Sequence, residues 1–121
     1  MADTLISVVD DSESVLDSIR NLLRSAGYKV ATFSSAELFL NTGDLSDTEC
    51  LILDLRMAGM DGLELQRRLK VLDVDFPIII VTAHGDHTNQ QLAMDAGASH
   101  FFHKPFAASD FLAAIQTALC G

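Results

Sequence analysis

Short apolar runs alternate with longer stretches of helical periodicity along this chain. The apolar runs are typical of strands and cover residues 5–9, 28–33, 49–53, 78–81 and 99–102. Three of these runs are nearly continuous, as in strands that are buried on both faces of a parallel sheet. The pattern therefore predicts a sheet whose middle strands are covered on both sides.

Between the strands, apolar residues recur at helical spacing behind capping residues. Helices are expected to begin near Ser12, at the capping-box spacing Ser34–Glu37, at Asp61 and at Asp86. The first helix stops at Gly27, the second runs through Leu40 into a polar loop at 41–47, and the fourth runs through Asp95. The buried faces of the third and fifth helices should carry Leu65, Leu69 and Leu72, and Phe111, Leu112, Ile115 and Leu119, respectively. Five strand–helix repeats over residues 1–121 predict one open, doubly wound α/β domain with helices on both faces.

Composition narrows the function classes. The chain has 121 residues, 49% of them hydrophobic, and a formal net charge of -9. Such acidity disfavours a nucleic-acid or anionic-membrane surface and suits a carboxylate cation site, although acidity alone also serves solubility. No apolar run approaches a membrane span, so the cytoplasm is the expected compartment. Cys50 lies inside an apolar run and Cys120 far from it, which indicates neither a disulfide frame nor a zinc site.

Polar residues that could bind a metal or take part in catalysis follow four different strands. They are Asp10 and Asp11, Asp54, Thr82, and Lys104. Because ligands of open α/β sheets bind beyond the carboxyl ends of the strands, these side chains are expected to converge. Three carboxylates at one rim repel each other, and a hard divalent cation such as Mg²⁺ would compensate for the repulsion. The expected direct ligands are Asp11 and Asp54, with Asp10 holding a metal-bound water.

The same set forms a phosphoryl-transfer site. Aspartate is an established phosphoryl nucleophile, and transfer depends on positioning and on neutralising the charge of the equatorial oxygens. Lys104 and Thr82 would each hold one of those oxygens. Each residue also has a plainer interpretation: Asp10 or Asp11 as a helix cap, Asp54 as a turn residue, Thr82 as a strand end and Lys104 as a solvated lysine. The joint placement after separate strands favours the site.

The chain resembles the response-regulator receiver family from Ile6 to Leu119. The resemblance rests on the acidic pair Asp10-Asp11 and on the segments 53–57, 59–62, 81–83, 97–98 and 104–106. The run from Gly62 to Leu69 is most similar to receivers of FixJ-like transcriptional regulators of the NarL type. The resemblance implies a flavodoxin-like fold with five parallel strands in the order 2-1-3-4-5 and five helices.

The resemblance also implies roles. Asp54 would accept a phosphoryl group from a sensor histidine kinase, and Mg²⁺ or Mn²⁺ would be bound by Asp10, Asp11, Asp54 and the backbone carbonyl of Arg56. Thr82 and Phe101 would be the switch residues, Lys104 the phosphate-binding lysine, and Pro105 would follow a cis bond. The receiver would be a phospho-acceptor rather than an enzyme. Phosphorylation would change the face made by the fourth helix, fifth strand and fifth helix for dimerisation with a second copy or for control of a DNA-binding output domain.

Two departures from the family pattern stand out: Ala58 replaces a usual proline, and Ala107 replaces a usual Ser or Thr cap. His84 and Arg56 are candidates for tuning the lifetime of the phosphorylated state. The sequence leaves three other functional classes open. A phosphatase of the haloacid-dehalogenase type normally has a second aspartate at the position of Ser12. In a flavin-binding module, Asp10 and Asp11 would repel the flavin phosphate. A non-phosphorylated or stand-alone receiver would act by protein interaction. The chain is either such a stand-alone receiver or a domain excised from a longer regulator.

Overall fold

The computed structural model describes residues 4–43, 45–83 and 86–120. Strands and helices alternate strictly along these residues. The strands are β1 (Leu5–Val9), β2 (Lys29–Phe33), β3 (Thr48–Leu53), β4 (Ile78–Thr82) and β5 (His100–His103). The helices are α1 (Glu13–Ser25), α2 (Ala36–Thr42), α3 (Gly62–Val71), α4 (His87–Asp95) and α5 (Ala108–Cys120). The predicted alternation of elements is confirmed.

All strand pairs are parallel, and the sheet order is β2-β1-β3-β4-β5. This order confirms the predicted fold. β1, β3 and β4 occupy the middle, and their apolar side chains are almost wholly buried, as nearly continuous apolar runs require. Because the strands are parallel, their carboxyl ends lie along one edge of the sheet.

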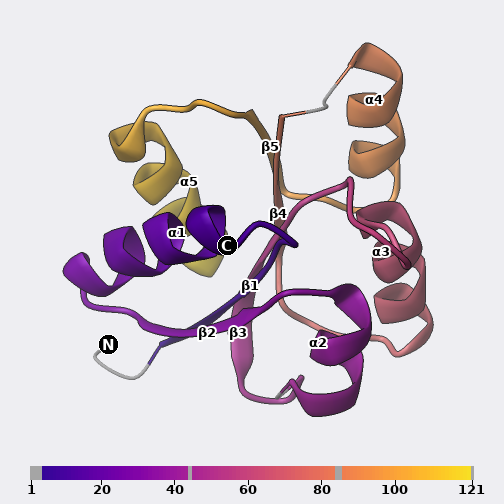
Figure 1. The fold of residues 1–121 in the computed structure, drawn as a ribbon, viewed down its shortest axis with the longest axis horizontal. Helices are drawn as coiled ribbons and strands as arrows, with labels where there is room; N and C mark the ends of the chain where they lie inside the picture. Colours follow the sequence, from indigo (N-terminus) through magenta and orange to yellow (C-terminus); the bar gives the residue numbers. More distant parts are fainter. Residues whose placement is uncertain (1–3, 44, 84–85, 121) are drawn as a thin grey trace.

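Each face of the sheet has its own core. On one face α1 and α5 bury Leu16, Ile19, Leu23, Phe111 and Ile115. On the other, α2, α3 and α4 bury Phe39, Leu65, Leu69 and Ala93. Figure 1 shows the two groups of helices on opposite sides of the sheet. β1 and β3 contribute alternate residues to the two cores, since successive strand side chains point to opposite faces.

The start of α2 differs from the prediction. The N-cap is Ser35, not Ser34, and the Ser35 hydroxyl accepts a hydrogen bond from the Leu38 amide. Glu37 therefore does not close a capping box with Ser34. The helix also runs past Leu40 to Thr42, whose hydroxyl donates to the Leu38 carbonyl, so the loop that follows is shorter than expected.

Leu72 was placed wrongly on the buried face of α3. Leu65 and Leu69 are buried, but Leu72 is the C-cap and 55% exposed, because the chain turns away at Asp73, which has a positive φ of 58°. Cys50 is buried, and Cys120 is exposed. Within the described part of the chain, no helix is long and apolar enough to cross a membrane.

Candidate functional site

Backbone hydrogen bonds bring the expected polar residues to one edge of the sheet. The amide of Asp10 donates to Phe33 at the end of β2, and the amide of Asp54 donates to Val9 at the end of β1, each over 3.1 Å. The amide of Lys104 donates to the Thr82 carbonyl over 2.9 Å. These bonds, together with the pairing of β3 with β4, hold the carboxyl ends of the strands side by side.

The carboxylates of Asp10, Asp11 and Asp54 form one cluster. One ligand oxygen from each lies within 4.8 Å of the others. Asp10 and Asp54 are buried, with exposed fractions of 2% and 6%, whereas Asp11 is exposed. The Lys104 ammonium lies 2.8 Å from Asp10 Oδ2 and 3.6 Å from Asp54 Oδ2, so one cation spans both buried carboxylates.

The pKa of Asp10 is raised within this cluster. Burial raises its pKa above the ordinary aspartate value, and the neighbouring Asp54 charge raises it further. Hydrogen bonds from Lys104 and from the Ser12 amide act in the opposite direction. The upward shift of the Asp10 pKa prevails, chiefly because the carboxylate is removed from water.

The helix-cap interpretation of the acidic pair is not what the structure shows. Ser12 is the N-cap of α1, and its hydroxyl accepts from the Val15 amide. Asp10 instead accepts from the Ser12 amide over 2.9 Å. Asp11 reaches the loop after β3, where its Oδ2 accepts from the Ala58 amide over 3.3 Å. Both carboxylates thus face the strand ends.

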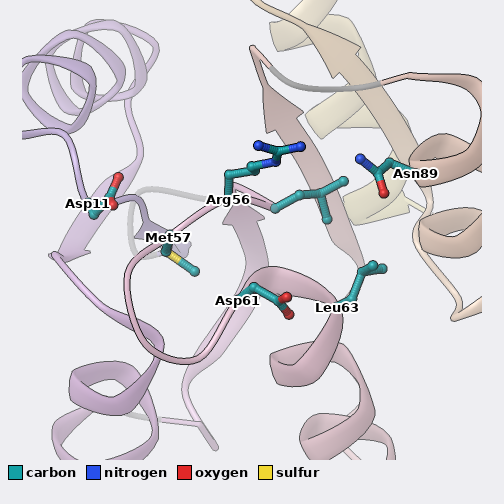
Figure 2. Close-up of a pocket in the computed structure, with 7 residues that line it drawn as sticks. Asp11, Arg56, Met57, Asp61, Leu63 and Asn89 are labelled. Atoms are coloured by element: carbon teal, nitrogen blue, oxygen red, sulfur yellow. The ribbon is translucent and has the colours of Figure 1, made fainter.

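A cleft of about 430 Å³ opens beside Asp11. Its lining comes from the β1–α1 loop, the β3–α3 loop, the start of α3 and α4 (Figure 2). The lining residues are Asp11, Leu55, Arg56, Met57, Asp61, Leu63 and Asn89. Of the three clustered carboxylates, Asp11 alone borders this cleft.

Comparison with known proteins identifies the family. The family described as the response regulator receiver domain matches residues 6–116. The chain belongs to this family. It is 46% identical over 117 residues to the response regulator protein TmoT of Ectopseudomonas mendocina, a match that covers 97% of this chain and 53% of that protein.

Two further relatives agree. The transcriptional regulatory protein FixJ of Bradyrhizobium diazoefficiens is 40% identical over 94% of this receiver and 56% of FixJ. The solved structure of the response regulator StyR matches with a TM-score of 0.89 and 45% identity, over 97% of this receiver and 59% of that chain. The receiver thus spans about half the length of the curated relatives that it matches.

The remaining expected residues lie on β4, β5 and the loop after it. Thr82 is fully buried at the end of β4. Phe101, half-buried, packs on the α3–α4 side of the sheet, and its ring lies 5.8 Å from that of His103. Phe102 points to the opposite core, against Phe106 and Phe111. The Lys104–Pro105 bond is cis. His84 lies outside the described residues.

The sequence did not single out several residues around the receiver's site. Asn89 and Leu63 border the cleft from α4 and α3. Glu37 was interpreted as part of a capping box, but its Oε2 accepts from the Met60 amide over 3.0 Å. Asp61, predicted as a cap, accepts from the Glu64 amide and also lines the cleft. The cap role of Asp61 was predictable from local sequence, but the Glu37–Met60 contact joins distant segments and could not be.

Proposed function

We propose that this receiver accepts a phosphoryl group on Asp54 and thereby relays a signal. The observation that carries the proposal is the convergence of three carboxylates and Lys104 beside the fully buried Thr82. A buried, half-compensated carboxylate cluster is costly in a purely structural protein. It is well suited to binding a cation and an anionic group together.

The donor set fits a magnesium ion. All three side chains offer the oxygen ligands that Mg²⁺ prefers. We propose Asp11, Asp54 and the Arg56 carbonyl as direct ligands, with Asp10 acting through a bound water; Mn²⁺ has the same ligand preferences. When bound, the cation would neutralise negative charge on the carboxylates and on a transferred phosphoryl group. A bound cation would also offset the cost of burying the Asp10 carboxylate, whose pKa is raised chiefly by that burial and further by the neighbouring Asp54 charge.

The transfer itself needs little covalent chemistry from the protein. An Asp54 carboxylate oxygen forms a bond to the phosphorus of a phosphohistidine as the phosphorus–nitrogen bond breaks. The imidazole leaves with that electron pair and regains a proton from solvent. Lys104, already 3.6 Å from Asp54, and the Thr82 hydroxyl would bind phosphoryl oxygens. Attack by water on the phosphorus later releases inorganic phosphate and restores the Asp54 carboxylate, so the phosphoryl group is a temporary signal rather than a product.

The readout would pass through β4 and β5. Thr82 ends β4, and Phe101 lies opposite Ile80 on the neighbouring β5. Movement of Thr82 toward the phosphoryl group would favour an inward position of Phe101 and change the α4–β5–α5 face. Relatives such as FixJ are named transcriptional regulators. We propose that the partners are a sensor histidine kinase in the cytoplasm, a second receiver and a DNA-binding output domain.

The proposal is tested with a small phosphodonor such as acetyl phosphate. Intact-mass spectrometry should detect one added phosphoryl group on the wild-type protein with Mg²⁺. The addition should disappear with a chelator and in Asp54→Asn. A wild-type protein that gains no phosphoryl group in any condition would instead favour a receiver that acts only through protein contacts.

A further inference from the structure

The loop between β3 and α3 is held by carboxylates at every second amide. The Arg56 amide donates to Asp54 Oδ1 over 3.3 Å, and the Ala58 amide donates to Asp11 Oδ2 over 3.3 Å. The Met60 amide donates to Glu37 Oε2 over 3.0 Å. These three acceptors come from the end of β3, the β1–α1 loop and α2. The first of these bonds is local to the loop, whereas the other two fix the loop to the β1–α1 loop and to α2.

Two of these three acceptors have a second task in the proposed function. Asp11 and Asp54 are the proposed direct ligands of the cation, so their oxygens would be shared between the cation and the loop amides. A carboxylate–amide bond at 3.3 Å is already at the long end of hydrogen-bond distances. Glu37 lies outside the carboxylate cluster. Its bond to Met60 is therefore the one that cation binding leaves undisturbed.

Glu37 projects from a helix turn that is capped and packed into the core. It lies in the first turn of α2, two residues after the Ser35 cap and between the buried residues Ala36 and Phe39. The Phe39 ring packs edge-on against those of Phe33 and Phe76, at centroid distances of 5.2 and 6.4 Å. A carboxylate on such a fixed helix holds its partner at low entropic cost. α2 thus gives the loop an anchor that is part of the core.

The loop backbone is shaped to receive this carboxylate. Gly59 has a positive φ of 78°, and a Cβ placed there would lie 2.7 Å from Glu37 Oε2. Only glycine lets the chain turn at this point and also leaves room for the carboxylate. The Met60 amide is the largest cause of a lowered pKa at Glu37, as expected for a charge-assisted bond.

We propose that Glu37 is a positioning residue of the metal site: its carboxylate fixes the 58–60 segment through the Met60 amide and keeps the Arg56 carbonyl available to the cation. The inference rests on the proposed function, because the Arg56 carbonyl matters only if a cation binds there. Glu37 touches neither cation nor phosphoryl group. It acts through the loop backbone.

Calorimetric titration with MgCl₂ tests the inference on four proteins. Glu37→Ala removes the acceptor, and Glu37→Asp keeps the charge but is one methylene too short to reach Met60. Both should weaken Mg²⁺ binding about two- to fivefold, the effect of losing one exposed, charge-assisted hydrogen bond. Glu49→Gln is the matched control, because it removes the same charge from an exposed position at the opposite end of β3, and its affinity should equal that of the wild type.

Three further measurements separate positioning from folding. In the NMR spectrum of the cation-free protein, the chemical shift of the Met60 amide proton should change in Glu37→Ala and remain unchanged in Glu49→Gln. Glu37→Gln, which keeps a side-chain carbonyl of the right length, should restore part of the affinity. Circular dichroism verifies that each variant is folded before titration.

The outcomes are distinguishable. If the wild type binds Mg²⁺ and both Glu37→Ala and Glu37→Asp bind it equally well, the positioning role is wrong and the proposed function stands. Equal weakening in Glu37→Ala and Glu49→Gln would mean that only net charge matters, which also overturns the inference. A wild type that binds no Mg²⁺ overturns the proposed metal site, and the role of Glu37 with it.

Discussion

Replacing Lys104 by methionine should expose the electrostatic cost of the carboxylate cluster. The substitution keeps an apolar stem of similar length and removes the ammonium that lies 2.8 Å from Asp10 and 3.6 Å from Asp54. With an effective dielectric constant near 20, these two attractions amount to about 6 and about 5 kcal/mol. Desolvation of Lys104 and ordering of its side chain oppose most of that sum.

The net loss should be about 2–4 kcal/mol in the absence of divalent cations. This lies just below the roughly 3–5 kcal/mol expected for a fully buried pair, since the Lys104 side chain retains 19% exposure and Asp10 can take up a proton. In urea unfolding followed by circular dichroism, the midpoint should fall by about 1–2 M. Lys70→Met, at an exposed position on α3, should leave it nearly unchanged.

Magnesium gives this prediction a second readout. A cation bound to the cluster would replace the missing positive charge, so Mg²⁺ should stabilise Lys104→Met more than it stabilises the wild type. Unfolding of Lys104→Met at the same urea concentration as Lys70→Met would refute a role for Lys104 in compensating the cluster. Equal stabilisation of Lys104→Met and the wild type by Mg²⁺ would refute it as well.

Three other outcomes follow from individual side chains. Burial raises the pKa of the Cys50 thiol to about 12, so the reactive thiolate forms only at strongly alkaline pH. Mass spectrometry should find an alkylating reagent only on Cys120 in the native protein and on both thiols in denaturant. Gln66 Oε1 is buried without a hydrogen-bond partner, while Gln66 Nε2 donates to the Ala93 carbonyl, which also accepts from the Ala98 amide. Gln66→Met would remove the unpaired oxygen and leave the Ala93 carbonyl paired, so the unfolding free energy should change by less than about 1 kcal/mol. A loss above about 2 kcal/mol in urea unfolding would contradict this. Burial raises the pKa of Asp10, so the contribution of Asp10 to stability is present at low pH and is lost as pH rises through that pKa. Without Mg²⁺, Asp10→Asn should therefore raise the melting temperature more at neutral than at mildly acidic pH. An equal change at both pH values would contradict this prediction.

The fold could be predicted because its signals are local and redundant. Three nearly continuous apolar runs became β1, β3 and β4, and the strand ends delivered Asp10, Asp54 and Thr82 to one edge. The family resemblance supplied the strand order, which apolar runs alone do not determine.

The errors and omissions have physical causes. Ser34 and Ser35 are equally able to cap, and the choice of Ser35 leaves Glu37 free for Met60, 23 residues away. Leu72 has the spacing of a core residue but follows the last turn of α3. Ala58 stood out in the sequence only as a departure from the family pattern. Its amide donates to Asp11, a contact that proline could not make because it has no backbone N–H.

Chemical mapping of the phosphoryl group tests the central claim most directly. After incubation with acetyl phosphate and Mg²⁺, borohydride reduction converts an aspartyl phosphate into homoserine, which peptide mass spectrometry locates. Homoserine at position 54 alone is the expected result. Homoserine at position 10 or 11, or none in a protein that has gained a phosphoryl group, would contradict the assignment of Asp54.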